Sequence, residues 1–176
     1  MKPLRRRYAK IERLVDSILA AAKIDEPPVP VERIVRSIGV AVRRGALGEV
    51  SGLLVRVGSS ATIGVNVAHA KVRQRFTIAH EYGHFVLHDG MASHFDNDFR
   101  INFRSVESSQ ATNVEEIEAN YFAACLLMPK SFLDRDDALS CLDDDDGVAA
   151  LAKKYNVSRH AMSLRLGNAY KNHLPF

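Results

Sequence analysis

Cysteine residues and long apolar runs are both scarce in this sequence. Among the 176 residues only Cys125 and Cys141 are cysteines, and neither belongs to a CxxC pair, so nothing indicates a disulfide framework. The longest apolar run, Tyr121–Met128, is far shorter than the roughly 18 to 20 residues that cross a bilayer. We therefore expect neither structural disulfides nor a membrane-spanning helix.

The N-terminus also lacks the continuous apolar core of a signal peptide. The basic start "MKPLRRRYAK" is followed by the amphipathic stretch "IERLVDSILAAAKI" and not by an apolar core with a cleavage site. A formal net charge of +3 is too small to indicate nucleic-acid binding by itself. With 47% hydrophobic and 26% charged residues, the composition is typical of a soluble globular protein. We expect a cytoplasmic protein.

The N-terminal part of the chain predicts two helices followed by a small sheet. Apolar residues at helical spacing predict a helix over residues 9–24, which the prolines of "DEPPVP" end, and a shorter helix over 31–38 that ends at Gly39. Three β-branched segments separated by glycine and serine then predict a three-stranded antiparallel sheet. These segments are "VAVRR", "GLLVRV" and "ATIGVNV".

The rest of the chain is predicted to be helical apart from one long segment. Helical periodicity covers residues 71–88 and 114–128, and the polar residues 89–113 between them are expected to form a loop that is a candidate lid. Pro129 ends the second of these helices or restarts it as "PKSFLDR". Two short helical patterns follow the aspartate run at 143–146. The predicted fold class is thus α+β and mainly helical.

His80, Glu81 and His84 form an HExxH pattern in the predicted helix over 71–88. Residues i and i+4 lie one turn apart on the same helix face, so His80 and His84 can bind one zinc ion. Glu81 is rotated by about 100° from His80, which lets it act as a general base on a water at the metal and not as a ligand. The alternative is a core helix whose histidines are only hydrogen-bonded.

His88 continues the histidine stripe but is too far along the helix to join the same ion. At 1.5 Å per residue it lies about 12 Å from His80, whereas zinc–ligand bonds are about 2 Å long. We predict that His88 is a helix-end residue or one that supports a ligand. A third ligand must therefore come from elsewhere in the chain. The helix over 114–128 offers three glutamates: Glu115, Glu116 and Glu118.

Glu116 is the predicted third ligand. Asn120 follows it by four residues on the same helix face, as a polar group that can hydrogen-bond a ligand histidine or hold the carboxylate. Glu118 instead shares its face with Phe122 and Cys125, an arrangement typical of packing. Glu118 remains the alternative ligand.

Three segments of the chain together resemble the ImmA/IrrE-type metallopeptidases. They are "RQRFTIAHEYGHFVLH" at 73–88, "EEIEANYFAACLLMP" at 115–129 and "LAKKYNVSRHAMSLRL" at 151–166. HExxH alone occurs in many zinc enzymes, whereas its combination with AN-x-FA-x3-LLMP is far more specific. The helical N-terminus and the three strand segments also resemble the layout of this family.

The resemblance implies a gluzincin-like zinc endopeptidase with a mainly helical, zincin-like domain. His80, His84 and Glu116 would be the zinc ligands and Glu81 the catalytic base. The implied substrate is a cytoplasmic helix-turn-helix transcriptional repressor or antitoxin, often encoded nearby, whose cleavage relieves repression.

The third of these segments has the spacing of a helix-turn-helix, with a turn at Asn156, an apolar Val157 and a serine cap at 158. We expect residues 141–176 to form a helical subdomain packed on a peptidase domain of residues 1–140. A helical pair of this kind is more often a packed surface motif or docking element than a DNA reader. The candidates for DNA contact are Arg159, His160, Ser163 and Arg165.

Two other functions are compatible with the sequence. A non-catalytic regulator that binds DNA or sequesters a repressor would use zinc only for structure. A toxin–antitoxin component would hydrolyse a different cytoplasmic target with the same chemistry. Replacing the candidate base with glutamine, Glu81→Gln, separates the regulator from a peptidase, because only a peptidase needs this carboxylate.

Overall fold

The computed structural model describes residues 5–88, 93–96 and 111–170 and divides into two compact units. One unit comprises Pro30–Ala123, and the other comprises Met1–Val29 together with Ala124–Phe176. None of the helices in the described ranges has the length and apolar character that a bilayer crossing needs. The predicted domain boundary at residue 140 stays a prediction.

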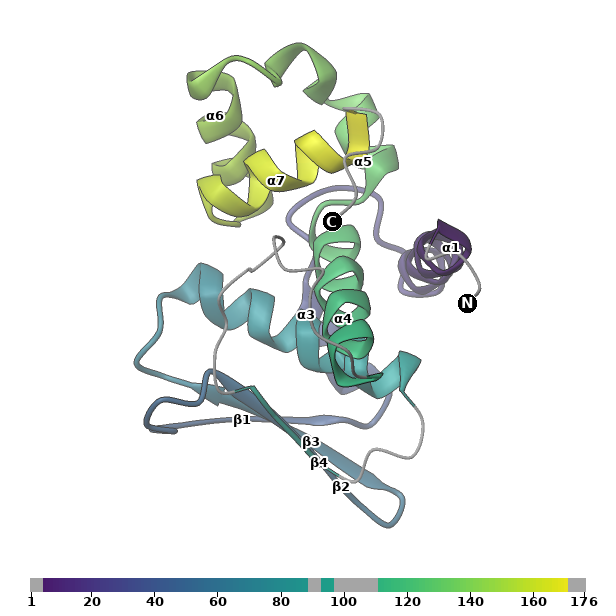
Figure 1. The fold of residues 1–176 in the computed structure, drawn as a ribbon, viewed down its shortest axis with the longest axis vertical. Helices are drawn as coiled ribbons and strands as arrows, with labels where there is room; N and C mark the ends of the chain where they lie inside the picture. The colour runs from purple at the N-terminus through teal and green to yellow at the C-terminus, as the bar shows by residue number, and fades with distance from the viewer. Residues whose placement is uncertain (1–4, 89–92, 97–110, 171–176) are drawn as a thin grey trace. The chain divides into compact units, whose positions relative to one another are not determined.

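The unit Pro30–Ala123 is built on a four-stranded mixed sheet with the strand order β1-β3-β2-β4 (Figure 1). Strand β2 pairs antiparallel with both β3 and β4, whereas β1 pairs parallel with β3. A tight turn with Gly58 at φ +57° joins β2 to β3. The bounds of the strands are β1 Ala41–Gly45, β2 Gly52–Val57, β3 Ser60–Asn66 and β4 Ser93–Asp96.

The α+β class is confirmed, but the expected three-stranded antiparallel sheet is wrong in two respects. The chain direction alternates along β1, β2 and β3 as expected, yet β3 lies between β1 and β2 and so runs parallel to β1. Periodicity identifies strands but does not encode their order in space. In addition, β4 falls within the segment expected to be a loop. Residues 89–92 and 97–110 of that segment lie outside the described residues.

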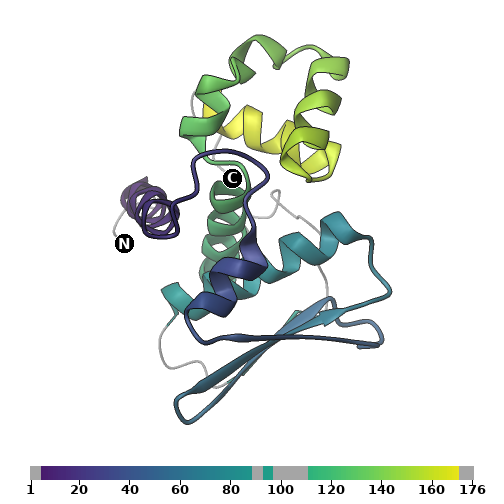
Figure 2. The same ribbon diagram turned by 180° about the vertical axis from the view of Figure 1, so that it is seen from behind.

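Two helices of this unit, α2 (Val31–Ser37) and α3 (Lys71–Leu87), cover the same face of the sheet (Figure 2). Helix α3 packs on β2 and β3. Helix α2 ends where predicted, because Gly39 adopts a φ of +84° that continues neither helix nor strand. The buried apolar side chains of the unit include Leu54, Ile63, Val65, Phe76 and Ile78.

Helix α4 spans Ala111–Leu127 and belongs to both units, since the division falls between Ala123 and Ala124. The second unit is otherwise helical, with α6 and α7 side by side (Figures 1 and 2). Its two cysteines, Cys125 and Cys141, are free thiols. The helices of this unit are α1 Arg5–Ala21, α5 Lys130–Arg135, the short 3₁₀ helix η1 Ala138–Cys141, α6 Asp145–Tyr155 and α7 Arg159–Tyr170.

The predicted turn between α6 and α7 is confirmed in its local geometry. Asn156 adopts the left-handed conformation at φ 54° and ψ 52°, and Val157 is buried. The Ser158 hydroxyl oxygen accepts a hydrogen bond of 3.1 Å from the Ala161 amide, which is a serine cap at the start of α7.

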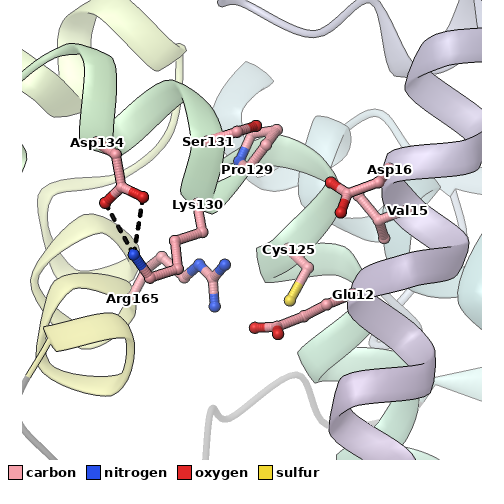
Figure 3. A pocket seen from close by; sticks show the side chains of 9 residues that line it. All are labelled: Glu12, Val15, Asp16, Cys125, Pro129, Lys130, Ser131, Asp134 and Arg165. Carbon is pink, nitrogen blue, oxygen red and sulfur yellow. Dashed lines mark hydrogen bonds and ion pairs between the residues drawn. The ribbon is translucent and has the colours of Figure 1, made fainter.

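One of the four candidates for DNA contact is not accessible. Arg165 is only 3% exposed, and its Nε donates a 3.0 Å hydrogen bond to the Met128 carbonyl. It shares the buried face of α7 with Met162 and Leu166, so the expectation of an outward-facing arginine is wrong. Arg165 extends into a cavity of about 240 Å³ lined by residues of this unit (Figure 3).

Candidate metal centre

Two histidines of α3 meet in a T-shaped arrangement in the interior of the unit Pro30–Ala123. His80 and His84 are one helical turn apart, their ring centroids are separated by 4.7 Å, and the rings are inclined by 73°. Their Nε2 atoms lie 3.1 Å apart, and the two residues are only 1% and 0% exposed. The i and i+4 spacing therefore brings two buried imidazole nitrogens to one point, as predicted.

Glu116 of α4 reaches the same point from the other side. Its Oε2 lies 3.4 Å from His80 Nε2 and its Oε1 lies 3.2 Å from His84 Nε2. One ligand-type atom from each of the three residues lies within 4.8 Å of the other two. The Glu116 side chain is 38% exposed, so the group is buried on the histidine side and open on the glutamate side.

The spacing and chemistry of these atoms fit a tetrahedrally bound metal ion. Ligands at 2.0 to 2.1 Å from zinc are separated from one another by about 3.3 Å along the edges of a tetrahedron. The three separations measured here are 3.1, 3.2 and 3.4 Å. Two imidazoles and one carboxylate also form the donor set of a catalytic zinc site that keeps a fourth position open.

Asn120 sets the orientation of one histidine. Its Oδ1 lies 2.9 Å from His80 Nδ1, and an amide oxygen can only accept a hydrogen bond. The proton of neutral His80 must then sit on Nδ1, which leaves the lone pair of Nε2 facing His84 and Glu116. This contact is one of the two anticipated from the position of Asn120 on the Glu116 face of α4, namely the hydrogen bond to a ligand histidine.

His88 and Glu118 lie next to this group but not in it. His88 Nδ1 is 3.0 Å from His84 Nδ1, and His88 Nε2 is 3.3 Å from Glu118 Oε2. His88 follows the last residue of α3 and contacts a candidate ligand, as predicted. Of the two glutamates left open by the sequence, the structure brings Glu116 to the two Nε2 atoms and Glu118 to His88.

Glu81 lies on the face of α3 that β2 covers. The residue is fully buried, and a Cβ added at Gly52 would come within 3.3 Å of Glu81 Oε1 and 2.2 Å of Thr77 Cγ2. A side chain at position 52 therefore requires a shift of the buried Thr77 side chain, of this strand or of α3. Gly52 was not among the residues singled out in the sequence, although an isolated glycine in a strand pattern signals such a close approach.

A second glycine allows α3 and α4 to cross closely. A Cβ at Gly83 would lie 3.1 Å from Ala119 Cα, 3.2 Å from Ala119 O and 3.1 Å from Phe122 Cδ1. Ala119 and Phe122 are fully buried, so this crossing is part of the core. Gly83 is the glycine inside HExxH, and its position in a helix interior was the available signal for such packing.

Arg56 of β2 binds the C-terminal end of α3. Its Nη2 donates to the carbonyls of His84 at 3.3 Å, Phe85 at 2.9 Å and His88 at 3.4 Å. Its guanidinium also lies 4.7 Å from the centroid of the Phe85 ring. A cation at this end of a helix is favoured by the unpaired carbonyls and by the helix dipole. No sequence pattern distinguishes this arginine from the others.

Comparison with known families shows to which family the chain belongs. A peptidase family model, the IrrE N-terminal-like domain, matches residues 35–167. The chain belongs to the ImmA/IrrE metallopeptidase family. The matched range contains α3 and α4 with all the residues of the candidate metal centre, whereas α1 lies outside it. No curated protein matches the chain.

Proposed function

We propose that this metallopeptidase is a zinc-dependent endopeptidase that cleaves a helix-turn-helix transcriptional repressor or antitoxin and so relieves repression. The observation that carries the chemistry is the convergence of His80 Nε2, His84 Nε2 and the Glu116 carboxylate, with Glu81 on the same helix as the two histidines. Membership of the family supports peptidase activity. The repressor substrate is supported by the resemblance of the three sequence segments described above.

In this proposal His80, His84 and Glu116 hold the zinc ion. A bound zinc ion supplies Lewis-acid activation of water and of the scissile carbonyl. The Glu81 carboxylate accepts a proton from the attacking water and delivers it to the nitrogen of the leaving amine. The side of the site where Glu116 is part-exposed is the one from which a peptide can approach, because both imidazoles are buried.

The decisive experiment separates metal binding from catalysis. We expect Glu81→Gln to retain one zinc ion per chain and to lose cleavage by about 100-fold or more, because a positioned general base contributes roughly 10² to 10⁴ in rate. Zinc is measured by elemental analysis, and cleavage is measured on the helix-turn-helix proteins encoded beside this gene, with and without a chelator. Glu115→Gln is the matched control, since Glu115 lies on the same helix as Glu116 but outside the metal group. Undiminished cleavage by Glu81→Gln would refute the role of Glu81 as the general base.

A second function is favoured by the exposed residues at the start of α7. Arg159, His160 and Ser163 are solvent-exposed, as a DNA-binding or repressor-sequestering regulator with a structural zinc ion requires. In such a regulator Glu81→Gln leaves gene regulation intact and Arg159→Ala abolishes it. The endopeptidase shows the opposite pattern. Arg165 is unsuitable for this test because its loss would disturb the core.

A further inference from the structure

A hydrogen-bonded chain leads from the metal group into the interior of the unit Pro30–Ala123. His84 Nδ1 lies 3.0 Å from His88 Nδ1, and His88 Nε2 lies 3.3 Å from Glu118 Oε2. The three residues are 0%, 7% and 5% exposed. Because water has little access to them, the hydrogen bonds of the two imidazoles have to be satisfied mainly within the protein.

The direction of each hydrogen bond follows from the role of His84. A histidine that offers the Nε2 lone pair to a metal carries its proton on Nδ1, so His84 donates to His88 Nδ1. The His88 Nδ1 atom must then be an acceptor, and the proton of neutral His88 sits on Nε2. The Nε2–H group of His88 then donates a hydrogen bond to a carboxylate oxygen of Glu118. With a metal ion on His84 Nε2, this is the one arrangement of protons that forms both hydrogen bonds, from His84 to His88 and from His88 to Glu118.

We propose that His88 and Glu118 are positioning residues that hold His84 in its metal-binding tautomer. This inference rests on the proposed metal centre, but it does not depend on the nature of the substrate. Glu118 favours the Nε2 proton on His88, and His88 in turn favours the Nδ1 proton on His84. The hydrogen bond from His84 to His88 also makes the His84 imidazole a stronger ligand, because an acceptor on the far nitrogen of a metal-bound histidine raises its basicity.

Helix α4 thus supports both candidate ligands of α3 in different ways. Asn120 binds His80 directly through an amide oxygen, whereas Glu118 acts on His84 through an intervening imidazole. Glu116 on the same helix supplies the ligand itself. The placement of the metal group and the tautomers of its histidines therefore depend on the same packing of α3 against α4.

The test is the affinity of the full chain for Zn²⁺, measured by competition with a chromophoric chelator. We expect His88→Leu, which removes the acceptor, to weaken Zn²⁺ binding by about 10 to 100-fold. His88→Gln should restore most of the affinity, because its amide oxygen can accept from His84 Nδ1. His160→Ala is the control for the loss of any histidine, since His160 is exposed on α7. It should bind Zn²⁺ like the wild type.

A second measurement starts from the wild-type chain, so its main result does not depend on the folding of a variant. Nitrogen NMR of labelled histidine in the zinc-loaded wild-type chain should show His88 with its proton on Nε2 and His84 with its proton on Nδ1. Glu118→Gln should leave His84 metal-bound while weakening the preference of His88 for this tautomer, because a neutral amide is a poorer acceptor than a carboxylate.

Three results would overturn the inference. The first is unchanged Zn²⁺ affinity in His88→Leu, and the second is a wild-type His88 with its proton on Nδ1. The third is an equal loss of affinity in His88→Leu and His88→Gln, which indicates a purely structural role. Each result is separate from the proposed peptidase function, because a protein that binds Zn²⁺ in the expected pattern but cleaves nothing retains the tautomer chain.

Discussion

Glu116 and Glu118 are two residues apart on α4, and because of this spacing their side chains lie in different surroundings. Successive residues of a helix are rotated by about 100°, so these two carboxylates point roughly 160° away from each other. Glu116 lies between His80 and His84, whereas Glu118 is buried beside His88. A metal ion held by the two histidines is therefore within reach of only one of the two glutamates.

At the scale of single residues, we predict different Zn²⁺ affinities for variants of these two glutamates. Glu116→Gln replaces a direct anionic ligand and should weaken Zn²⁺ binding by more than about 100-fold, beyond the range expected for groups that only support a ligand. Glu118→Gln should weaken Zn²⁺ binding by a smaller factor than Glu116→Gln does. Both values come from the same chelator competition, and an equal or reversed order would refute the assignment of Glu116 as the ligand.

Gly83 provides a test of the crossing between α3 and α4. An alanine there gains about 1 kcal/mol in helix propensity but places a methyl group 3.1 Å from the Ala119 backbone, which cannot move away like a flexible side chain. We predict a net loss of about 1 to 3 kcal/mol in the free energy of unfolding, measured with urea. The control is Gly167→Ala in α7, where nothing lies within 4 Å of the added Cβ. This control should stabilise the protein, and a stable Gly83→Ala would contradict the tight crossing.

At the scale of elements, the close packing of β2 on α3 limits the size of the side chain at position 52, next to the candidate base Glu81. A Cβ at Gly52 would overlap Thr77 Cγ2 at 2.2 Å and contact Glu81 Oε1 at 3.3 Å. Gly52→Ala should therefore displace the buried Thr77 side chain or push the strand away from the helix. Either change should lower the free energy of unfolding by about 1 to 3 kcal/mol and reduce cleavage. Gly45→Ala in β1 is the matched control, because its added Cβ meets nothing within 4 Å. Wild-type stability and cleavage in Gly52→Ala would show that the strand does not lie so close.

An ionic contact joins α2 to β1 and predicts a dependence of stability on pH. The Arg44 guanidinium, which forms a side-chain hydrogen bond with Glu32, and the neighbouring Arg36 lower the pKa of Glu32 from 4.5 to about 2, although burial opposes the shift. The stabilisation is complete above pH 4.5 and is lost as the pH falls towards about 2. Because the Glu32 carboxylate is 32% exposed, we expect this contact to contribute only about 1 kcal/mol to the free energy of unfolding.

This pH dependence is measured by urea unfolding at a series of pH values between 2 and 6. Glu32→Gln removes the titrating group and should flatten the corresponding part of the profile. An identical profile in the variant would show that other carboxylates are responsible.

For the whole molecule, a bound metal ion should raise the stability of the unit that contains it. Zinc at about 100 times its dissociation constant adds about 2.7 kcal/mol to the free energy of unfolding if it binds only the folded state. We expect the thermal unfolding transition of the wild type to rise on zinc addition and to fall again with a chelator. His84→Ala should show neither change, whereas His160→Ala should respond like the wild type. A zinc effect that survives in His84→Ala would place the ion elsewhere.

Features that depend on a few neighbouring residues were correctly predicted from the sequence. The pairing of His80 with His84 follows from the helical repeat, and the ends of α2 and α6 follow from residues that tolerate left-handed geometry, Gly39 and Asn156. The mainly helical α+β class follows from periodicity in the same way. The backbone geometry of one or two turns is sufficient to determine each of these features.

Other features were decided only by the tertiary structure, because they depend on how distant segments pack. The insertion of β3 between β1 and β2, the close approaches at Gly52 and Gly83, and the burial of Arg165 leave no reliable periodic signal. The same holds for the choice between neighbouring glutamates, since α3 and α4 meet across a separation of about thirty residues. The HExxH segment contains two histidines and one glutamate at helical spacing, whereas the crossing of α4 brings the Glu116 carboxylate to both histidines and Asn120 to His80.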